Sequence, residues 1–429
     1  MHSRFFCRLV RPAGAWTAVA LGLFICAAGA EARSFIYENI TDGSGGPGQG
    51  NAPSINQSGD IAFYQGTSTY FYDRSEGTFL NVTSLPGAPS EAWFPKLNGL
   101  GNIVMTEPST RNLWLFEADS ETFTNISALP GYPGNSQAHG WQLVFDLNDA
   151  NKVSFHSGDR NYGQVYVYDH ATQSFEAITG KPGGSSHGRE NSINNAGQVA
   201  YMGFPSVYLY DPATGTTTDI NNLPGGPGGL GDSFALNDRG DIAIFRPDAV
   251  TYYEASSGSF LYLATLPGFP AGSASSYGND LSNRGGISFW RTDLYYFDPI
   301  DRSFTRLNNN PSVPVGGMTT SINADGLIAM AAGLTSIEDI YLAVPLSRAD
   351  FDNDGDVDWA DLTVFQDCAT GPGIPYGPES LAPGCTLEPD DRERIAADFD
   401  NDSDVDQSDF GIFQRCYSDE SPADPTCDQ

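Results

Sequence analysis

The chain has 429 residues, of which 40% are hydrophobic and 17% charged, and its formal net charge at pH 7 is −32. Such an acidic chain lacks the Lys and Arg that neutralise phosphates, which excludes a nucleic-acid-binding protein. Beyond the leader described next, no stretch approaches ~18 consecutive apolar residues, which excludes a membrane-spanning segment in the mature protein. The acidity is uneven, because residues 350–429 hold 22 of the 53 acidic side chains and only three basic ones.

Residues 1–32 are predicted to be a secretory signal peptide. Three arginines among the first eleven residues form a basic region, and Ala18–Ala28 is a short apolar stretch. Ala28-Gly29-Ala30 or Ala30-Glu31-Ala32 then offers a small-x-small cleavage site. The segment is too short and wrongly flanked to span a membrane. We therefore expect a secreted or cell-surface protein.

A seven-residue phrase recurs after the leader: an aliphatic residue, usually Asn, two further residues, Gly, one residue, and Ile or Val. Its copies are Ile55–Ile61, Leu97–Ile103, Leu147–Val153, Ile193–Val199, Leu236–Ile242, Leu281–Ile287 and Ile322–Ile328. Asn151 replaces the glycine in the third copy. Asn tolerates a left-handed backbone well, so the phrase predicts a turn that needs a positive φ. A period near 40–45 residues with strand-like flanks is typical of a propeller blade.

Each repeat also contains an alternating aromatic segment that ends in an acidic residue and is followed by a turn and another strand. These segments are Tyr70–Asp73, Trp114–Glu117, Tyr166–Asp169, Tyr208–Asp211, Thr251–Glu254 and Tyr295–Asp298. The pattern predicts four short antiparallel strands in each unit. We interpret the aromatic stripes as packing between blades rather than as a platform for sugars.

The two ends of the repeat region predict how the ring closes. The seventh unit, from about Thr319 to Leu346, has only three strands, and the missing kind of strand occurs at Tyr37–Thr41. An N-terminal strand that completes the last blade would remove exposed sheet edges. We therefore predict an all-β domain at residues 33–346, a seven-bladed β-propeller closed by the N-terminal strand. The phrase also resembles short Ile-Asn-x-x-Gly-x-Ile/Val repeats of some bacterial extracellular proteins, which implies this fold and no activity.

Polar residues of the repeats could surround a ligand at the mouth of the propeller channel. The repeated asparagines are Asn56, Asn98, Asn148, Asn194, Asn237 and Asn323. An Asn at the start of a tight turn satisfies its own backbone. We therefore interpret these residues as turn formers.

No catalytic constellation stands out in the repeats. Four histidines occur in neighbouring units: His139, His156, His170 and His187. They accompany no metalloprotease, Cys-x-x-Cys or nucleophile-elbow motif. Glycoside hydrolysis needs two carboxylates that face the channel, and Asp60, Asp241 and Glu107 are candidates whose convergence the sequence leaves open. We favour a non-catalytic propeller.

A twelve-residue acidic phrase occurs twice near the C-terminus. Its acidic residues, at relative positions 1, 3, 5, 7, 9 and 12, are Asp350, Asp352, Asp354, Asp356, Asp358 and Asp361, and then Asp398, Asp400, Asp402, Asp404, Asp406 and Asp409. Positions 1, 3, 5, 9 and 12 are those that wrap a calcium ion in an EF-hand loop. So many carboxylates would repel one another unless a hard cation neutralised them. The sequence therefore predicts two Ca²⁺ sites.

The residues around these carboxylates distinguish the phrase from a solvated acidic run. Hydrophobic Val357 and Val405 occupy position 8 of the two copies. The amphipathic segments that follow, Leu362–Cys368 and Phe410–Cys416, carry a Phe and a Cys in register, 48 residues apart. We therefore expect a small α-helical module with paired EF-hand loops at residues 347–429.

Four of the six cysteines lie in the last 62 residues: Cys368, Cys385, Cys416 and Cys427. The other two belong to the leader. Four cysteines in an exported module indicate two disulfides, for which three connectivities exist. We favour Cys368–Cys385 and Cys416–Cys427, because each pair would close a short loop after one calcium motif.

The two motifs resemble type I dockerin repeats, a family with paired calcium loops that end in Asp and are each followed by a helix. The resemblance covers about the last 80 residues. It implies side-chain ligands at Asp350, Asp352, Asp354, Asp361, Asp398, Asp400, Asp402 and Asp409. It also implies backbone carbonyl ligands at Asp356 and Asp404, and ligation through water by Asp358 and Asp406.

The chain departs from the dockerin pattern in three places. A longer insert that includes a cysteine pair separates the repeats. The positions that dockerins use for partner choice differ between the copies, with Trp359-Ala360 in the first and Gln407-Ser408 in the second. Ser403 replaces the glycine at position 6, so we expect the second loop to bind calcium more weakly.

These observations predict a secreted calcium-binding protein whose dockerin-like tail mediates extracellular attachment or assembly of a non-catalytic propeller. The candidate partner is a cohesin-like or other extracellular protein, and the candidate ligand of the propeller is a glycan. Two alternatives stay open. The chain could be a dockerin-bearing component of polysaccharide degradation that binds or hydrolyses glycans, or a purely structural envelope protein in which calcium confers rigidity alone.

Overall fold

The computed structural model describes residues 33–428 except 135–144, 159–162, 205, 230, 232, 273–277, 310–312, 314–318, 335–336, 378–380 and 390–393. The predicted signal peptide and His139 therefore lie outside the described residues. No helix in the described part of the chain is long and apolar enough to cross a membrane.

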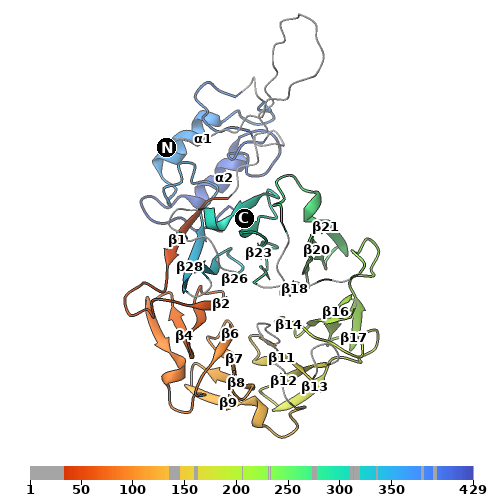
Figure 1. Cartoon of the computed structure of the whole chain (residues 1–429). Coiled ribbons are helices and arrows are strands. Elements are labelled where there is room, and N and C mark those ends of the chain that lie inside the picture. Colours follow the sequence, from red (N-terminus) through yellow and green to blue (C-terminus); the bar gives the residue numbers. More distant parts are fainter. Residues whose placement is uncertain are drawn as a thin grey trace, which may run out of the picture.

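Seven sheets of four antiparallel strands form a ring, with two helices beyond one edge of it (Figure 1). The prediction of a seven-bladed propeller is confirmed. Six blades are continuous in sequence: β2–β5 (Asn51–Ile55, Ile61–Gln65, Ser68–Asp73, Thr78–Asn81), β6–β9 (Trp93–Leu97, Ile103–Glu107, Asn112–Glu117, Thr122–Asn125), β10–β13 (Phe145–Leu147, Lys152–Ser157, Gln164–Asp169, Ser174–Ala177), β14–β17 (Asn191–Ile193, Val199–Gly203, Ser206–Asp211, Thr216–Asp219), β18–β21 (Ser233–Leu236, Ile242–Phe245, Val250–Glu254, Ser259–Tyr262) and β22–β25 (Asp280–Leu281, Ile287–Trp290, Leu294–Phe297, Phe304–Arg306).

The seventh blade joins the two ends of the repeat region. Its strands are β26 (Thr319–Ile322), β27 (Ile328–Leu334), β28 (Ile337–Pro345) and the N-terminal β1 (Phe35–Asn39). β1 pairs along the outer edge of β28, with Phe35 opposite Pro345 and Asn39 opposite Tyr341. The predicted closure by the N-terminal strand is confirmed, and it ties both ends of the propeller into one sheet.

The turn between the first two strands of each blade has the predicted left-handed backbone. Gly59 and Gly101 have φ of 85° and 80°, and Asn151, the single substitute, has φ of 54°. Short 3₁₀ turns follow four of the outer strands, at Val82–Ser84, Ile126–Ala128, Leu263–Thr265 and Leu307–Asn309. The glycine of the repeated phrase is therefore explained by backbone geometry.

The aromatic stripes fill the sheets and the spaces between them. Phe63 on β3 stacks on Tyr70, its cross-strand partner on β4, with ring centroids 5.7 Å apart. Phe155 and Tyr166 repeat this arrangement two blades further on. The buried clusters also join residues of adjacent blades, as predicted. Cross-strand stacking and packing between blades therefore use the same side chains.

The innermost strands surround a central channel. Seven aliphatic side chains, the first residues of the repeated phrase, are each 4–9% exposed: Ile55, Leu97, Leu147, Ile193, Leu236, Leu281 and Ile322. All seven line a cavity of about 200 Å³ on the side of the asparagine turns. Four of them also line a cavity of about 280 Å³ on the opposite side. The aliphatic ring, which we call the waist, therefore separates two cavities.

The C-terminal segment forms a small module with two short helices, α1 (Trp359–Cys368) and α2 (Gln407–Cys416). Each helix follows one acidic loop. The described residues just before the two loops, 337–349 and 394–397, contain no helix. The module is thus built from two loop–helix units rather than from two helix–loop–helix units.

Candidate metal centre

In the first acidic loop, backbone N–H groups donate hydrogen bonds to the carboxylates of the first and last residues. Asp361 is fully buried, and its Oδ1 accepts from the backbone N–H of Phe351 at 2.6 Å while its Oδ2 accepts from that of Asp358 at 2.9 Å. Asp350 accepts from Asp354 and Gly355 at 3.1 and 3.0 Å. The first and last residues of the loop therefore fix its curvature.

The second loop repeats this geometry residue by residue. Asp409 is fully buried and accepts from Phe399 at 2.7 Å and from Asp406 at 2.9 Å. Asp398 accepts from the backbone N–H of Asp402 and Ser403, both at 3.1 Å. Its Oδ2 also accepts from the hydroxyl of a residue in the insert, Tyr376, at 2.6 Å. The long insert thus supports the second loop.

Both helices begin at the end of a loop with the same capping box. Asp358 and Asp406 are the N-caps, and they accept from the backbone N–H two residues later. Asp361 and Asp409, at position 12, accept a hydrogen bond from the backbone N–H of the N-cap residue. Each position-12 carboxylate therefore links its loop to the helix that follows.

Ten of the twelve predicted site residues converge in groups whose ligand atoms lie within 4.8 Å of one another. The groups are Asp350–Asp352–Asp361, Asp356–Asp358–Asp361, Asp398–Asp400–Asp409 and Asp404–Asp406–Asp409. Asp354 and Asp402 lie outside these groups, although the resemblance predicts side-chain ligands there. Asp361 and Asp409 belong to two groups each, so each loop has one central carboxylate.

The position-7 residues also bring their carboxylates into the groups, which the dockerin resemblance does not imply. The resemblance implies that Asp356 and Asp404 contribute backbone carbonyls, whereas the structure gathers their carboxylates with those of the neighbouring positions. The Oδ1 atoms of both residues are buried and have no hydrogen-bond partner among the described residues. An orphaned, buried carboxylate oxygen is costly unless a cation or an ion partner satisfies it.

Burial and mutual repulsion raise the pKa of several of the clustered carboxyl groups. Desolvation, with a further contribution from the charge of Asp361, raises the pKa of Asp350 to about 6. Burial also raises the pKa of Asp361 and of Asp409, and in each case a neighbouring carboxylate adds to the shift. The donor set consists of oxygen atoms only, which suits a hard cation such as Ca²⁺. The residues present therefore fit the predicted ion.

The two loop–helix units interlock through position 8. Val357, in the first loop, accepts through its carbonyl from the backbone N–H of Ser418, which follows α2, at 2.9 Å. Val405, in the second loop, accepts from Thr370 and Gly371, which follow α1, at 3.0 and 3.1 Å. Each loop is therefore held by the chain that leaves the other unit's helix.

An aromatic core and two disulfides complete the module. Phe365 of α1 lies 5.3 Å from Phe413 of α2, between ring centroids, and Phe351 stacks on Phe399 at 6.3 Å. The favoured disulfides are confirmed as Cys368–Cys385 and Cys416–Cys427. Each one starts at the last residue of a helix. Disulfides that close loops of this size stabilise a domain by about 3 kcal/mol each.

Two arginines connect the module to the propeller. Arg33 pairs with Asp298 of the β24–β25 turn at 3.4 Å, and its Nη2 donates to the carbonyl of Pro425 at 2.8 Å. Arg348 lies within 3.4 Å of Asp298 and 3.8 Å of Asp428. The Asp298 and Asp428 side chains are at most 1% exposed, so the carboxylates of this junction are buried.

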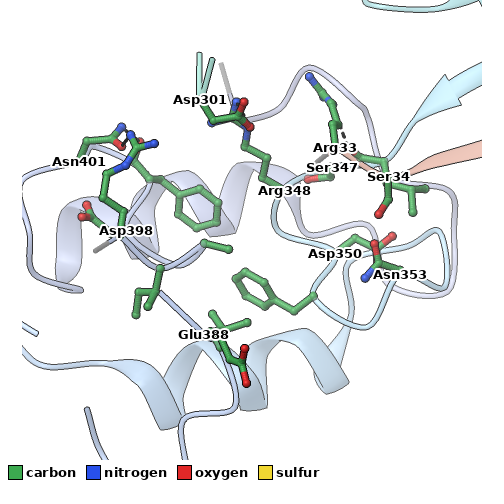
Figure 2. A pocket seen from close by; sticks show the side chains of 17 residues that line it. Arg33, Ser34, Asp301, Ser347, Arg348, Asp350, Asn353, Glu388, Asp398 and Asn401 are labelled. Carbon is green, nitrogen blue, oxygen red and sulfur yellow. Dashed lines mark hydrogen bonds and ion pairs between the residues drawn. The ribbon is translucent and has the colours of Figure 1, made fainter. Parts of the chain in front are cut away.

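A pocket of about 160 Å³ lies beside this junction and is lined by both acidic loops. Figure 2 shows Asp350 and Asp398 on opposite sides of the pocket, with Arg348 between them next to Asp301. The first residues of the two loops therefore face one space. The loops are close to the propeller as well as to each other.

The repeated asparagines form turns, as predicted, and they also connect the blades. In Asn98 the side-chain oxygen accepts from the N–H of Leu100 and Asn102, at 3.0 and 2.9 Å. Its Nδ2 donates to the carbonyl of Asn148 in the next blade at 3.0 Å, and Asn148 donates likewise to Asn194. Asn56, Asn194, Asn237 and Asn323 make equivalent contacts. These amides are used by the fold, so they do not form a ligand ring.

The acidic candidates of the propeller lie in three different blades, and each accepts hydrogen bonds from residues near it in the sequence. Asp60 and Asp241 each accept a hydrogen bond at 3.0 Å from a side-chain amide of the same turn. The donors are Asn56 and Asn237, respectively. Glu107 accepts from the hydroxyls of Ser90 and Thr110 in the second blade.

The described histidines do not belong to a metal cluster either. All four carboxylate groups identified above consist of Asp residues of the two loops. His170 lies 3.1 Å from Glu117, His187 contacts Ser186, and His156 is buried in β11. Each of these residues sits in a structural environment of its own blade or of the neighbouring one.

Comparisons with known proteins add the fold alone. No family model and no curated protein matches the chain. The match to the RRP9 WD40 repeats covers 74% of this chain and 99% of the RRP9 chain, at 13% identity and with a TM-score of 0.48. The match to virginiamycin B lyase from Staphylococcus aureus covers 73% of this chain and 99% of the lyase, at 10% identity and with a TM-score of 0.49. Similarities of this degree carry no functional information, and the dockerin resemblance rests on the residues themselves.

Proposed function

We propose that this protein binds two calcium ions in its C-terminal module and uses the calcium-loaded module to attach the propeller to an extracellular protein. The observation that carries the proposal is the convergence of five carboxylates in each loop around one buried residue, Asp361 or Asp409. Bound calcium supplies positive charge that neutralises each cluster. The position-12 residues then transmit the order of the loops to α1 and α2.

The proposed ligands follow from the groups above. In the first loop Asp361 shares one group with Asp350 and Asp352 and another with Asp356 and Asp358, and the second loop offers the corresponding five residues around Asp409. Asp354 and Asp402 remain proposed ligands on the strength of the dockerin resemblance. The two disulfides support an oxidising, extracellular location.

The first turn of each helix offers a docking face. Trp359, the first residue of α1, is 67% exposed, which is unusual for so large an apolar side chain. The corresponding residue of α2, Gln407, is exposed and polar. A protein partner that buries an aromatic anchor would therefore prefer the α1 end of the module.

The experiment is a calcium titration by calorimetry on the full chain and on two variants, Asp361→Asn and Asp409→Asn. We expect two sites in the native chain and one in each variant, because each substitution removes the central charge of one loop. Asp367→Asn, an exposed acidic residue of α1 outside the loops, is the matched control and should keep both sites. Two sites in every variant would contradict the proposal.

The same proteins test attachment. Immobilised native chain should retain an extracellular protein with calcium and release it with chelator, while the double variant Asp361→Asn/Asp409→Asn should retain none. Trp359→Ala should weaken retention without changing the calcium stoichiometry. Calcium binding without any calcium-dependent partner would favour a purely structural role for the ion.

A further inference from the structure

The channel cavity opposite the asparagine turns differs from the rest of the propeller in its chemistry. It measures about 280 Å³, near the lower end of the range for ligand pockets. Its floor is the waist, and its wall comes from the innermost strands of all seven blades. We call it the Lys96 cavity, because Lys96 of β6 is its one basic lining residue among the described residues. None of the lining residues comes from the calcium module.

The residue that precedes each waist residue forms a ring on the wall of this cavity: Ser54, Lys96, Asp146, Ser192, Ala235, Asp280 and Ser321. Four waist N–H groups donate to the ring residue of the preceding blade. They are those of Ile55 to Ser321, Leu97 to Ser54, Ile193 to Asp146 and Ile322 to Asp280, at 3.0–3.3 Å. The ring therefore connects the blades through side-chain oxygens.

Lys96 breaks this connection, because an ammonium group cannot accept a hydrogen bond. The waist N–H of the next blade, that of Leu147, donates instead to its own neighbour Asp146 at 2.9 Å. Ala235 is the other ring residue without an acceptor, and there too the next blade compensates, with Leu281 donating to Asp280. Ser54 shows the bond that a serine can accept at this position, although Ser192 does not accept one. Burial raises the pKa of Asp280 and the nearby charge of Lys96 lowers it, so the lysine also acts on a carboxyl of the ring. The propeller therefore does not need Lys96 as a hydrogen-bond acceptor, and its ammonium group brings a positive charge into the cavity.

The backbone around Lys96 is arranged to present side chains to the cavity. β2 and β6 both contain a bulge, and the bulged residues Ala52 and Phe94 line the cavity with φ of 47° and 54°. Left-handed non-glycine residues and bulges are costly, and they gather at binding sites. Phe94 also belongs to an aromatic group with Trp93 and Tyr64, whose ring centroids lie 5.2–6.1 Å apart. The cavity thus has an aromatic edge beside its lysine.

The charges around the cavity decide which ligand class it suits. Three lining carboxylates, Asp146, Glu190 and Asp280, outnumber the single ammonium. The formal net charge of the whole chain is −32, so an anionic ligand would be repelled at short and at long range. A neutral polyhydroxylated ligand can accept hydrogen bonds from Lys96, donate to the carboxylates, and place its C–H face on an aromatic ring. Such a ligand is a carbohydrate.

We infer that the Lys96 cavity binds the end of a neutral glycan, with Lys96 donating to ligand hydroxyls and Phe94 forming the edge of the site. This inference is independent of the calcium sites and assigns a ligand to the propeller itself. It predicts binding without hydrolysis, since Asp146 and Asp280 each accept three hydrogen bonds from the protein.

The test is calorimetric titration of the full chain with short neutral gluco-, xylo- and manno-oligosaccharides, and with oligogalacturonates as acidic comparators. The central variant is Lys96→Ser, which offers the acceptor found at Ser54 but removes the positive charge that acts on Asp280, so thermal unfolding checks that it is folded. Its affinity for the oligosaccharide that binds should fall about ten- to hundredfold, the worth of a hydrogen bond from a charged donor. Lys181→Ser, at a half-buried Lys outside the cavity that pairs with Glu176, makes the same charge change and should bind like the native chain.

Three results would overturn the inference. They are failure of every neutral oligosaccharide to bind, preference for the acidic series, and undiminished affinity of the folded Lys96→Ser variant. Native-like binding in the presence of chelator is expected, because the module does not contribute to the cavity. Loss of calcium sites with retained glycan binding, or the reverse, would separate the two proposals.

Discussion

At the scale of single residues, position 6 distinguishes the two loops. Gly355 and Ser403 both have positive φ, of 108° and 76°. Glycine adopts this conformation freely, whereas serine is strained by roughly 1–2 kcal/mol. A Cβ on Gly355 would also lie 3.1 Å from the side chain of Ile36 on β1. The first loop is therefore the better formed of the two and is packed against the propeller.

Ser403→Gly should relieve this strain. We expect the variant to gain about 1 kcal/mol in the free energy of unfolding of the module and to bind calcium more tightly at the weaker site. Gly355→Ser is the reverse change and should lower both quantities, with the larger effect because of Ile36. Calcium titration and thermal unfolding of the two variants measure this. Weaker binding by Ser403→Gly would contradict the role given to position 6.

The raised pKa of Asp350, about 6 against an ordinary value of 3.8, gives a pH prediction. In the calcium-free protein the folded module binds this proton more tightly than the unfolded chain does. Its stability should therefore be highest below the ordinary pKa and should fall as the pH rises through about 6. With saturating calcium the order reverses, because acid protonates the ligands and releases the ion.

Thermal unfolding of the full chain in calcium-free buffer and in excess calcium, at about pH 5 and about pH 7.5, measures this reversal. The propeller transition serves as the internal control for the effect of calcium, since the described residues of the blades contain no such cluster. The same pH trend for the module in both buffers would contradict the assignment of calcium to these carboxylates.

At the scale of the elements, the asparagine turns carry part of the propeller's stability. Asn148 is 3% exposed; it caps its own turn through Ala150 and Lys152 and donates to Asn194 in the next blade. In the sixth blade Ser282 occupies this position and keeps the cap, with Gly286 donating to its hydroxyl. The cap and the connection between blades can therefore be separated by substitution.

Asn148→Ala should cost roughly 2–4 kcal/mol in the free energy of unfolding of the propeller, because it removes the cap and leaves buried polar groups unpaired. Asn148→Ser should cost about half as much, since it copies the natural arrangement at Ser282 and loses only the bridge. Chemical denaturation of the two variants gives both values. Equal stability of Asn148→Ala and the native chain would show that the ring of amides has no energetic role.

Much of this architecture could be predicted from local sequence, because blades repeat their own turns and strands. The positive φ at Asn151, the closure by β1 and both disulfides follow from spacing and residue type. The contacts between repeats could not be predicted in this way. The acceptor for Asn98 lies 50 residues further on, and position 8 of each loop is paired with the exit of the other helix.

The lysine of the channel is visible in the sequence, but the sequence alone does not indicate a role for it. Lys96 occupies a position that is Ser, Asp or Ala in the other six repeats. Alignment of the repeats on their waist residues would have isolated it. Its significance depends on the hydrogen bond that four of the other ring residues accept from the next blade, which only the assembled blades reveal.

At the scale of the whole molecule, the C-terminal module is fixed to the propeller by ion pairs and hydrogen bonds. Arg33 precedes β1 and Arg348 follows β28, so both ends of the closing blade supply a cation to the same buried Asp298. Because these ion pairs are desolvated and joined to Asp428, removing one partner would leave uncompensated buried charge. A partner bound at α1 would therefore hold the Lys96 cavity at a fixed orientation.

The most direct test of the account is hydrogen exchange by mass spectrometry on the full chain, in calcium and in chelator. We predict that chelation exposes amides of residues 347–428 while those of the blades keep their protection, because calcium alone offsets the repulsion among the loop carboxylates. The Asp361→Asn/Asp409→Asn variant should resemble the chelated protein in both buffers. Equal protection of the module with and without calcium would contradict the central claim that the ion organises it.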